Sequence, residues 1–258
     1  MEQTFMKEKK ILPLVLSMSL PMMLSMLVNS LYNIVDSYFV AQISEQAMTA
    51  LSLVYPLQLL ETAIAVGFGI GMNAAAAYYL GAKEQQRADD IVTSGLILSL
   101  LHGVILMAAA LLFAPAFVSL LTENEKILAE GVKYSNLVFI FAVPNVIAIT
   151  FEKIFQAEGR MKVSMLSMLC GCVANIILDP LLIFGIGIFP KMGIEGAAIA
   201  TGIGQVIPLI VYLFIFIKHP VSLHFHWHKK VFQKRLMGQM YGVGIPATLN
   251  LALPSFMI

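Results

Sequence analysis

The stretch NIILDPLLIFG, residues Asn175 to Gly185, places an aspartate and a proline side by side in an otherwise apolar run. In a water-soluble protein such a pair is typical of a turn. Whether it marks a turn here depends on the solvent that surrounds the segment, and the composition of the whole chain indicates that solvent.

The 258-residue chain is 59% hydrophobic and 12% charged, with a mean hydropathy of +0.85. Ordinary globular domains are about half apolar and a quarter charged, so the composition predicts a membrane protein. The 16 basic and 15 acidic residues form no basic stripe, which argues against nucleic acid as a partner. Cys170 and Cys172 would diverge on a helix, so we interpret them as small apolar fillers rather than as a disulfide or metal site.

Apolar runs of spanning length follow one another along the chain. A membrane helix needs about 20 residues, and such runs cover 11–40, 47–80, 91–121, 132–156, 162–189 and 193–217, with a seventh starting near 236. The first run is too long for a cleavable signal peptide. We therefore expect an all-α integral membrane protein in three parts: a six-helix transmembrane bundle at 1–217, a basic cytoplasmic connection at 218–235, and the truncated start of a second bundle at 236–258.

The connections between these runs carry their positive charge unevenly. Thirteen Lys and Arg residues fall on one side of the membrane and three on the other. The positive-inside rule then predicts a multi-pass protein of the inner (plasma) membrane with a cytoplasmic N-terminus.

The connection KHPVSLHFHWHKKVFQKR, residues 218–235, is the longest polar stretch and holds four of the five histidines. His224 and His228 would share a helix face, so a metal site is one interpretation, although no carboxylate or thiolate joins them in the sequence. The favoured interpretation is a basic, Trp-containing helix that lies on the cytoplasmic surface.

The two ends of the chain show a weak internal repeat with a period of 225 residues. Lys9 and Lys10 precede Pro21 with the spacing by which Lys234 and Arg235 precede Pro246. Such a repeat is typical of transporters built from paired bundles. It suggests that the sequence is half of a protein of about twelve helices.

Polar residues inside the predicted spans are costly, about 2.5–3.5 kcal/mol for an Asp at a helix centre, and so need a reason. Asn29, Asn33 and Asp36 fall on one stripe of the first helix, and Asp179 follows Asn175 by four residues. At 1.5 Å per residue, Asp36 lies ~35 Å from the inner end of its helix, Asp179 ~26 Å from the inner end of the fifth, and Thr201 ~12 Å below the outer end of the sixth. These residues can therefore converge at similar depth in the outer half.

The Asp-Pro pair now has a candidate role. Pro180 disfavours helical geometry at Asp179 and frees the carbonyl of Ile176 from its helical partner. Broken helices that present carbonyls beside carboxylates are a recurring way of binding Na⁺ or H⁺ in transporters. We interpret the group as a cation or proton site. In the structural alternative Asp36 caps a helix end, Asp179 bonds a neighbouring helix and Pro180 is only a kink.

Of the other polar groups and glycines inside the predicted spans, Glu61 allows two interpretations and the rest have a structural one. Glu61 could line a substrate cavity and pair with a cationic ligand, or satisfy a polar group on a neighbouring helix. Glu152 and Lys153 are expected near a helix end, where snorkelling explains them. The glycines of GFGIGMNAAAAYYLGA and GIEGAAIATGIGQ favour close helix packing. No nucleotide-binding loop, zinc motif or nucleophile elbow is present, so we expect a transporter without a cofactor and not an enzyme.

Several segments together resemble the multidrug and toxic compound extrusion (MATE) family: SLPMMLSMLVNSLYNIVDSYFV, ALSLVYPLQ, YYLGAKEQQRAD, FQAEGRMKVSM, NIILDPLLIFG and MGIEGAAIATGIGQ. The resemblance covers nearly the whole chain. It implies two six-helix bundles in a V shape that export cationic or amphipathic drugs in exchange for Na⁺ or H⁺. It also implies a cation site in the first bundle at Asp36, Asn175, Asp179 and Thr201.

We therefore expect the first bundle of a cation-coupled antiporter, in which ion binding changes how the first helix bends near Pro21, with Pro180 as a second hinge. No metal is expected apart from Na⁺ at the cation site. A lipid-linked oligosaccharide flippase of the same superfamily is an alternative, although such cavities tend to be basic. A non-transporting truncated half is another. Activity would then need self-association or a complementing second half.

Overall fold

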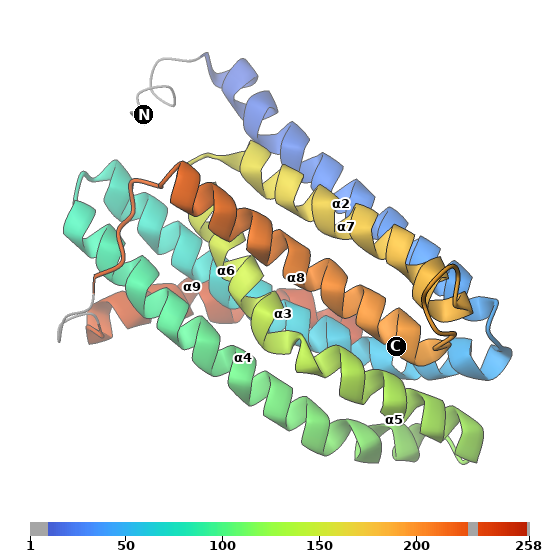
Figure 1. The fold of residues 1–258 in the computed structure, drawn as a ribbon. Helices are drawn as coiled ribbons and strands as arrows, with labels where there is room; N and C mark the ends of the chain where they lie inside the picture. Colours follow the sequence, from blue (N-terminus) through green and yellow to red (C-terminus); the bar gives the residue numbers. More distant parts are fainter. Residues whose placement is uncertain (1–9, 227–231, 257–258) are drawn as a thin grey trace.

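The computed structural model describes residues 10–226 and 232–256, and this part of the chain is helical with short connections (Figure 1). The helices are α2 (Ile11–Ala41), α3 (Glu45–Gly81), α4 (Gln85–Leu121), α5 (Glu125–Ile140), α6 (Ala142–Ala157), α7 (Met161–Phe184), α8 (Ile194–Lys218) and α9 (Lys234–Ala252), followed by the short 3-10 helix η1 (Leu253–Phe256). The all-α prediction is confirmed.

Among the described residues, five helices are individually long and apolar enough to cross a membrane: α2, α3, α4, α7 and α8. Helices α5 and α6 together make a sixth span, bent by 47°. These six correspond to the six predicted spans. The more polar α9 does not belong to this set, although it packs along α3.

The fourth span was expected as one helix and is instead two. The helix is interrupted at Phe141, three residues before Pro144. Proline has no N–H to offer the carbonyl of Ile140, and its ring crowds that carbonyl, so the helical hydrogen bonds are broken there. The Phe141 ring fills the bend and packs against Gly202 of α8, where any Cβ would overlap the ring.

The fifth span also differs from its prediction, which placed its end at residue 189. Helix α7 ends at Phe184 because Gly185 adopts a left-handed conformation (φ 73°), and the N–H groups of Gly185 and Ile186 both bond the carbonyl of Leu181 at 3.1 Å. The expected break at Asp179 is absent: α7 is continuous through Asp179 and Pro180.

Close contacts between helices occur where glycines remove the side chain. At Gly171 of α7, an added Cβ would overlap the carbonyl oxygen of Gly204 in α8. At Gly71 of α3, an added Cβ would overlap the carbonyl oxygen of Met240 in α9. The interpretation of these glycine-rich segments as packing surfaces is confirmed.

Two apolar clusters hold the bundle together. One includes Tyr79 of α3, Phe155 of α6 and Tyr212 of α8, together with Met240 of α9. The other joins the opposite ends of the helices and includes Val54, Tyr134, Val138, Phe139 and Ile183. Helix α2 packs mainly against α7, beside which it lies in Figure 1, and turns large apolar side chains outward.

The connection after α8 is fixed to the bundle as an extended strap, defined here as residues 219–226. Glu158 at the end of α6 accepts hydrogen bonds from the N–H of Ser222, from its hydroxyl at 2.7 Å and from the N–H of Leu223 at 3.1 Å. Asp89 of α4 accepts from the N–H of His224 at 2.9 Å. The side chain of Leu223 is buried in the first apolar cluster.

The prediction of a surface helix is therefore wrong for residues 219–226, which are not helical and whose backbone donates hydrogen bonds to the buried Asp89 and the half-buried Glu158. Trp227 and His228 lie outside the described residues. The rings of His224 and His226 stack at 6.0 Å, with His226 Nε2 3.8 Å from Asp89. Within the described ranges, no three His, Cys, Asp or Glu side chains are grouped as a metal site.

Replacing Asp89 with asparagine is expected to loosen the strap. Asp89 is 4% exposed and accepts from the strap backbone and from Gln85, and hydrogen bonds to charged groups are worth about 1.5–3 kcal/mol. The melting temperature in detergent should fall by several degrees and proteolysis between α8 and α9 should accelerate. Glu84→Gln is the control, since its ion pair with Arg87 is exposed. Equal behaviour of the two variants would contradict the prediction.

Candidate functional site

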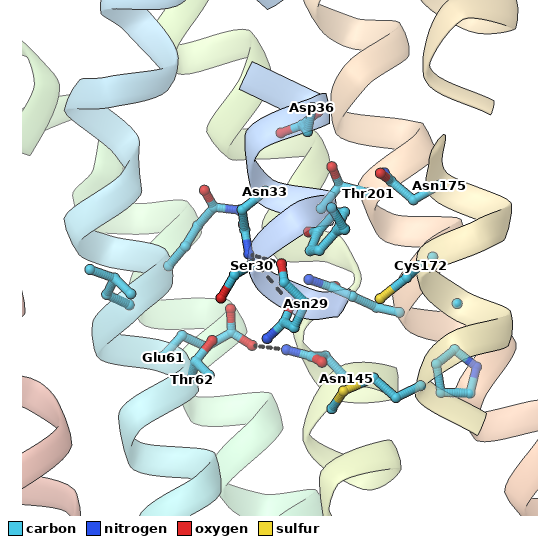
Figure 2. A pocket seen from close by; sticks show the side chains of 18 of the residues that line it. Asn29, Ser30, Asn33, Asp36, Glu61, Thr62, Asn145, Cys172, Asn175 and Thr201 are labelled. Atoms are coloured by element: carbon cyan, nitrogen blue, oxygen red, sulfur yellow. Dashed lines mark hydrogen bonds between the residues drawn. The ribbon is translucent and has the colours of Figure 1, made fainter. Parts of the chain in front are cut away.

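A cavity of about 930 Å³ opens among α2, α3, α6, α7 and α8. Carboxylates from three helices reach its wall: Asp36 of α2, Glu61 of α3 and Glu152 of α6. Polar groups gather at two levels, with Asp36, Thr201 and Asn175 at one and Glu61 with Asn145 at the other (Figure 2). The cavity borders both apolar clusters, touching Leu51 and Tyr134 of one and Tyr212 of the other.

The predicted polar stripe of α2 lies on this cavity. Asn29, Asn33 and Asp36 all line it, as does Tyr32. The side chain of Asn33 donates to the carbonyl of Asn29 at 2.7 Å, which ties the asparagines of the stripe to the helix backbone. The i, i+4, i+7 spacing produces this arrangement because such residues share one helix face.

The structure also brings together the four residues selected for the cation site. Asp36, Asn175 and Thr201 line the cavity, while Asp179 lies behind them and is 0% exposed. Asn175 donates to Oδ1 of Asp179 at 3.3 Å. In the other amide orientation Asn175 donates to Oδ2 at 3.1 Å and accepts from the N–H of Thr201 at 3.2 Å, which links α7 to α8.

Two oxygens at this level are buried without a hydrogen-bond partner in the part of the chain that the structure describes. They are Oδ1 of Asp36 and Oγ1 of Thr201. Asp36 and Asp179 are close enough for their charges to interact, and neither forms an ion pair with a described Lys, Arg or His. Two buried carboxylates without a basic partner repel each other unless a proton or a cation neutralises them. The donor set, which is all oxygen, suits a hard cation.

The second level is built around Glu61, which is 7% exposed. Its Oε1 accepts from Asn145 Nδ2 at 3.2 Å, across the gap between α3 and α6 (Figure 2). Glu61 therefore lines the cavity and also satisfies a polar neighbour, while its pairing with a cationic ligand stays a prediction. Asn145 follows Pro144, so the bend in the fourth span carries it to the wall.

Several polar residues of the cavity wall were not predicted from the sequence. Asn145, Gln58, Thr62 and Gln205 were not selected. Gln58, Glu61 and Thr62 stand at i, i+3 and i+4, a polar stripe on an apolar helix that could have identified this face of α3. Asn145 has no such neighbours on its helix, and only the tertiary structure reveals its partner.

The snorkelling interpretation of Glu152 and Lys153 is wrong. Lys153 is 8% exposed and its Nζ lies 3.0 Å from Oε1 of Glu152, so both charges pair inside the bundle and do not reach outward to water. Helix α3 also contacts this residue: Asn73 donates to the main-chain carbonyl of Lys153 at 2.8 Å, and Gly69 faces its aliphatic stem. A buried ammonium group is tolerated only when it has a charged partner such as Glu152.

The two prolines and two cysteines considered in the sequence lie within the helices of the bundle. Pro21 is buried within α2 and its carbonyl accepts from the hydroxyl of Ser25 at 2.9 Å. Pro180 lies within α7, and as hinges both prolines stay predictions. Cys170 and Cys172 are free thiols, and Cys172 lines the cavity.

Comparison with known proteins places this geometry in a family. The MatE family model matches residues 21–181. The chain is 28% identical over 259 residues to the multidrug export protein MepA of Staphylococcus aureus (strain MRSA252), covering 99% of this chain and 56% of that protein. It is 29% identical over 254 residues to MepA of Staphylococcus haemolyticus (strain JCSC1435), covering 98% and 55%.

Solved structures agree with the sequence comparison. An outward-facing conformation of a multidrug resistance MATE family transporter of the MOP superfamily superimposes with a TM-score of 0.84 at 27% identity, covering 92% of this chain and 52% of that one. A MOP superfamily transporter from Pyrococcus furiosus, described as having a binding pocket of reverse polarity that suggests a different function, matches with the same TM-score, identity and coverage. The chain thus spans about half the length of the relatives it matches. By its family match and its fold, this chain belongs to the MATE family of multi-pass membrane transporters.

Proposed function

We propose that this chain forms the ion-binding bundle of an exporter that exchanges Na⁺ or H⁺ for cationic or amphipathic compounds. The observation that carries the proposal is the pair of buried carboxylates, Asp36 and Asp179, which have no basic partner in the described chain and adjoin a large cavity. A proton or Na⁺ bound here removes their repulsion. Asp36, Asn175, Asp179 and Thr201 would hold the ion, with Asp36 facing the cavity.

The charge of the cavity wall supports a cationic substrate. Among the described residues, its lining includes three carboxylates and neither Lys nor Arg. An anionic lipid-linked oligosaccharide would be repelled by such a wall, so the flippase alternative is disfavoured. Glu61 and Asn145 would receive the positive group of the substrate, and Tyr32, Tyr55 and Met168 supply adaptable contact for its apolar body.

The positive-inside pattern supports a plasma-membrane orientation with the N-terminus in the cytoplasm, so that Asp36 lies towards the outer face. A transport cycle also needs a second bundle, since the relatives are about twice as long. A complementing half or a second copy of the chain would supply it. Each charge moved across the membrane is worth ~2.3 kcal/mol per 100 mV, enough to drive useful accumulation.

The proposal is tested with vesicles that contain the purified chain and a fluorescent cationic dye. An imposed Na⁺ or H⁺ gradient should drive dye movement, and dissipating that gradient should stop it. As a second readout, the melting temperature of the detergent-purified chain should rise in Na⁺ relative to K⁺, or change with pH, because a ligand that binds the folded state stabilises it. Dye movement independent of either gradient, with no ion-dependent stabilisation, would refute ion coupling.

A further inference from the structure

The carboxylate of Glu152 lies on the cavity wall but is already occupied by groups of its own helix. Its Oε1 accepts from Lys153 Nζ at 3.0 Å and from Gln156 Nε2 at 2.6 Å. Lys153 Nζ also donates to Oε1 of Gln156 at 3.1 Å. The three side chains form a closed network. Glu152, one of the three carboxylates on the cavity wall, is therefore already paired with a positive group of the protein itself.

This pairing is not imposed by the helix. Residues i and i+1 point about 100° apart on a helix, so Lys153 must curl back to reach Glu152. The lysine stem packs against α3, where a Cβ added to Gly69 would lie 2.8 Å from Lys153 Cγ. Lys153 itself does not line the cavity, whereas Glu152 does. The ammonium group therefore approaches the carboxylate from behind the wall and leaves its cavity side accessible.

Measured along α6, Glu152 lies at a different level of the cavity wall from Glu61 of α3, whose partner Asn145 is also on α6. Asn145, Ala148, Ile149 and Glu152 line the cavity at i, i+3, i+4 and i+7 spacing. Seven residues of helix place Glu152 ~10 Å along the axis from Asn145, the partner of Glu61. A ligand with two positive groups about that far apart could meet Glu61 with one and Glu152 with the other.

We propose that Lys153 is an internal competitor that holds Glu152 in the empty cavity and is displaced by the second positive charge of a dicationic substrate. The inference rests on the proposed export of cationic compounds and names dications as a class that this cavity accepts. A monocation would bind at Glu61 and leave the Glu152–Lys153–Gln156 network intact. When no substrate is bound, the lysine thereby neutralises Glu152, whose charge would otherwise be buried without a partner.

The test compares hexyltrimethylammonium, with one positive charge, and hexamethonium, with two. Both share a trimethylammonium group on a six-carbon chain, and this chain can hold the two charges of hexamethonium about as far apart as the two levels of the cavity. Their dissociation constants are measured by equilibrium dialysis against the detergent-purified 258-residue chain. Lys153→Gln should tighten the binding of hexamethonium about tenfold and that of hexyltrimethylammonium much less, since it frees one carboxylate. Glu152→Gln leaves the ammonium group of Lys153 unpaired and should weaken hexamethonium more than hexyltrimethylammonium. The double variant Glu152→Gln with Lys153→Gln should lose the gain.

The matched control is Lys133→Gln, which removes the same charge from an exposed pair with Glu195 at 3.5 Å and should change neither constant. A ratio of the two dissociation constants that Lys153→Gln leaves unchanged overturns the inference and makes the ion pair purely structural. If that variant does not fold, an unchanged ratio in Glu152→Gln overturns it equally. Failure of the parent chain to bind either ion refutes the cationic substrate class as well, whereas binding of hexyltrimethylammonium with a constant ratio refutes this inference alone.

Discussion

Replacing Asp36 with asparagine is expected to reduce the rate of ion-driven dye movement about tenfold or more, while the protein stays folded. Asp36 is 6% exposed, and its Oδ1 has no hydrogen-bond partner among the described residues. Removing its charge therefore strands no partner, and it relieves the repulsion from Asp179. An amide of the same shape cannot take up a proton or balance the charge of Na⁺. The variant should keep its melting temperature and lose the stabilisation by ions.

The measurement is the initial rate of dye movement in vesicles, paired with melting curves in Na⁺ and in K⁺. Asp179→Asn should give the same loss, with Asn175 still able to bond the new amide. Glu123→Gln is the matched control, because Glu123 is exposed in the connection between α4 and α5. Undiminished ion-driven movement in Asp36→Asn would refute the assignment, whichever ion couples. The melting curves extend the test to a chain that binds ions but needs its second bundle to transport.

The convergence of Asp36, Asn175, Asp179 and Thr201 was predictable because helices in a bilayer have little freedom. Their length, their alternating direction and the 3.6-residue period fix both the depth and the facing of each side chain. Asp36 and Asp179 come from helices that start on the same side, so counting residues sufficed to place both in the outer half. The close approach of α7 and α8 was signalled on one side only, by the glycine-rich segment that contains Gly204, whereas its partner Gly171 was not singled out from the sequence.

Features that depend on specific contacts between distant residues were not predictable in this way. The hydrogen bond between Glu61 and Asn145 joins two helices, and the two residues are 84 positions apart in sequence. The strap looked like a surface helix because it is basic, yet its form is set by Asp89 and Glu158, which lie in α4 and at the end of α6. Lys153 was expected to reach water, but the structure packs its stem against α3 and keeps its ion pair with the neighbouring Glu152 inside the bundle. In each case a contact with another helix or with the strap overrides the local pattern.

The second large effect is expected at a glycine, Gly171, whose replacement by alanine should destabilise the bundle and damage the ion site together. An added Cβ would overlap the carbonyl oxygen of Gly204 and lie 2.6 Å from Pro208 Cγ. Neither obstacle can move aside by changing a side-chain rotamer, so α7 and α8 must separate. Overpacking of this kind costs about 1–3 kcal/mol, and a clash with backbone belongs at the upper end.

The matched control is Gly238→Ala in α9, where an added Cβ meets nothing within 4 Å. Alanine there should stabilise the helix by up to ~1 kcal/mol, so the same substitution has opposite signs at the two positions. Melting temperatures in detergent measure both effects, and an unchanged value for Gly171→Ala would contradict the packing argument.

Ion-dependent stabilisation separates damage to the site from a general loss of stability. Asn175 lies one helical turn beyond Gly171, and its Cβ would be 3.0 Å from a Cβ on Gly204, so the seam at Gly171 continues into the proposed ion site. A shift of α7 away from α8 moves Asn175 and Asp179 relative to Thr201. Gly171→Ala should therefore lose the extra stability that ions give the parent, even at temperatures where it remains folded. Gly238→Ala should retain it in full, because α9 contributes nothing to the ion site.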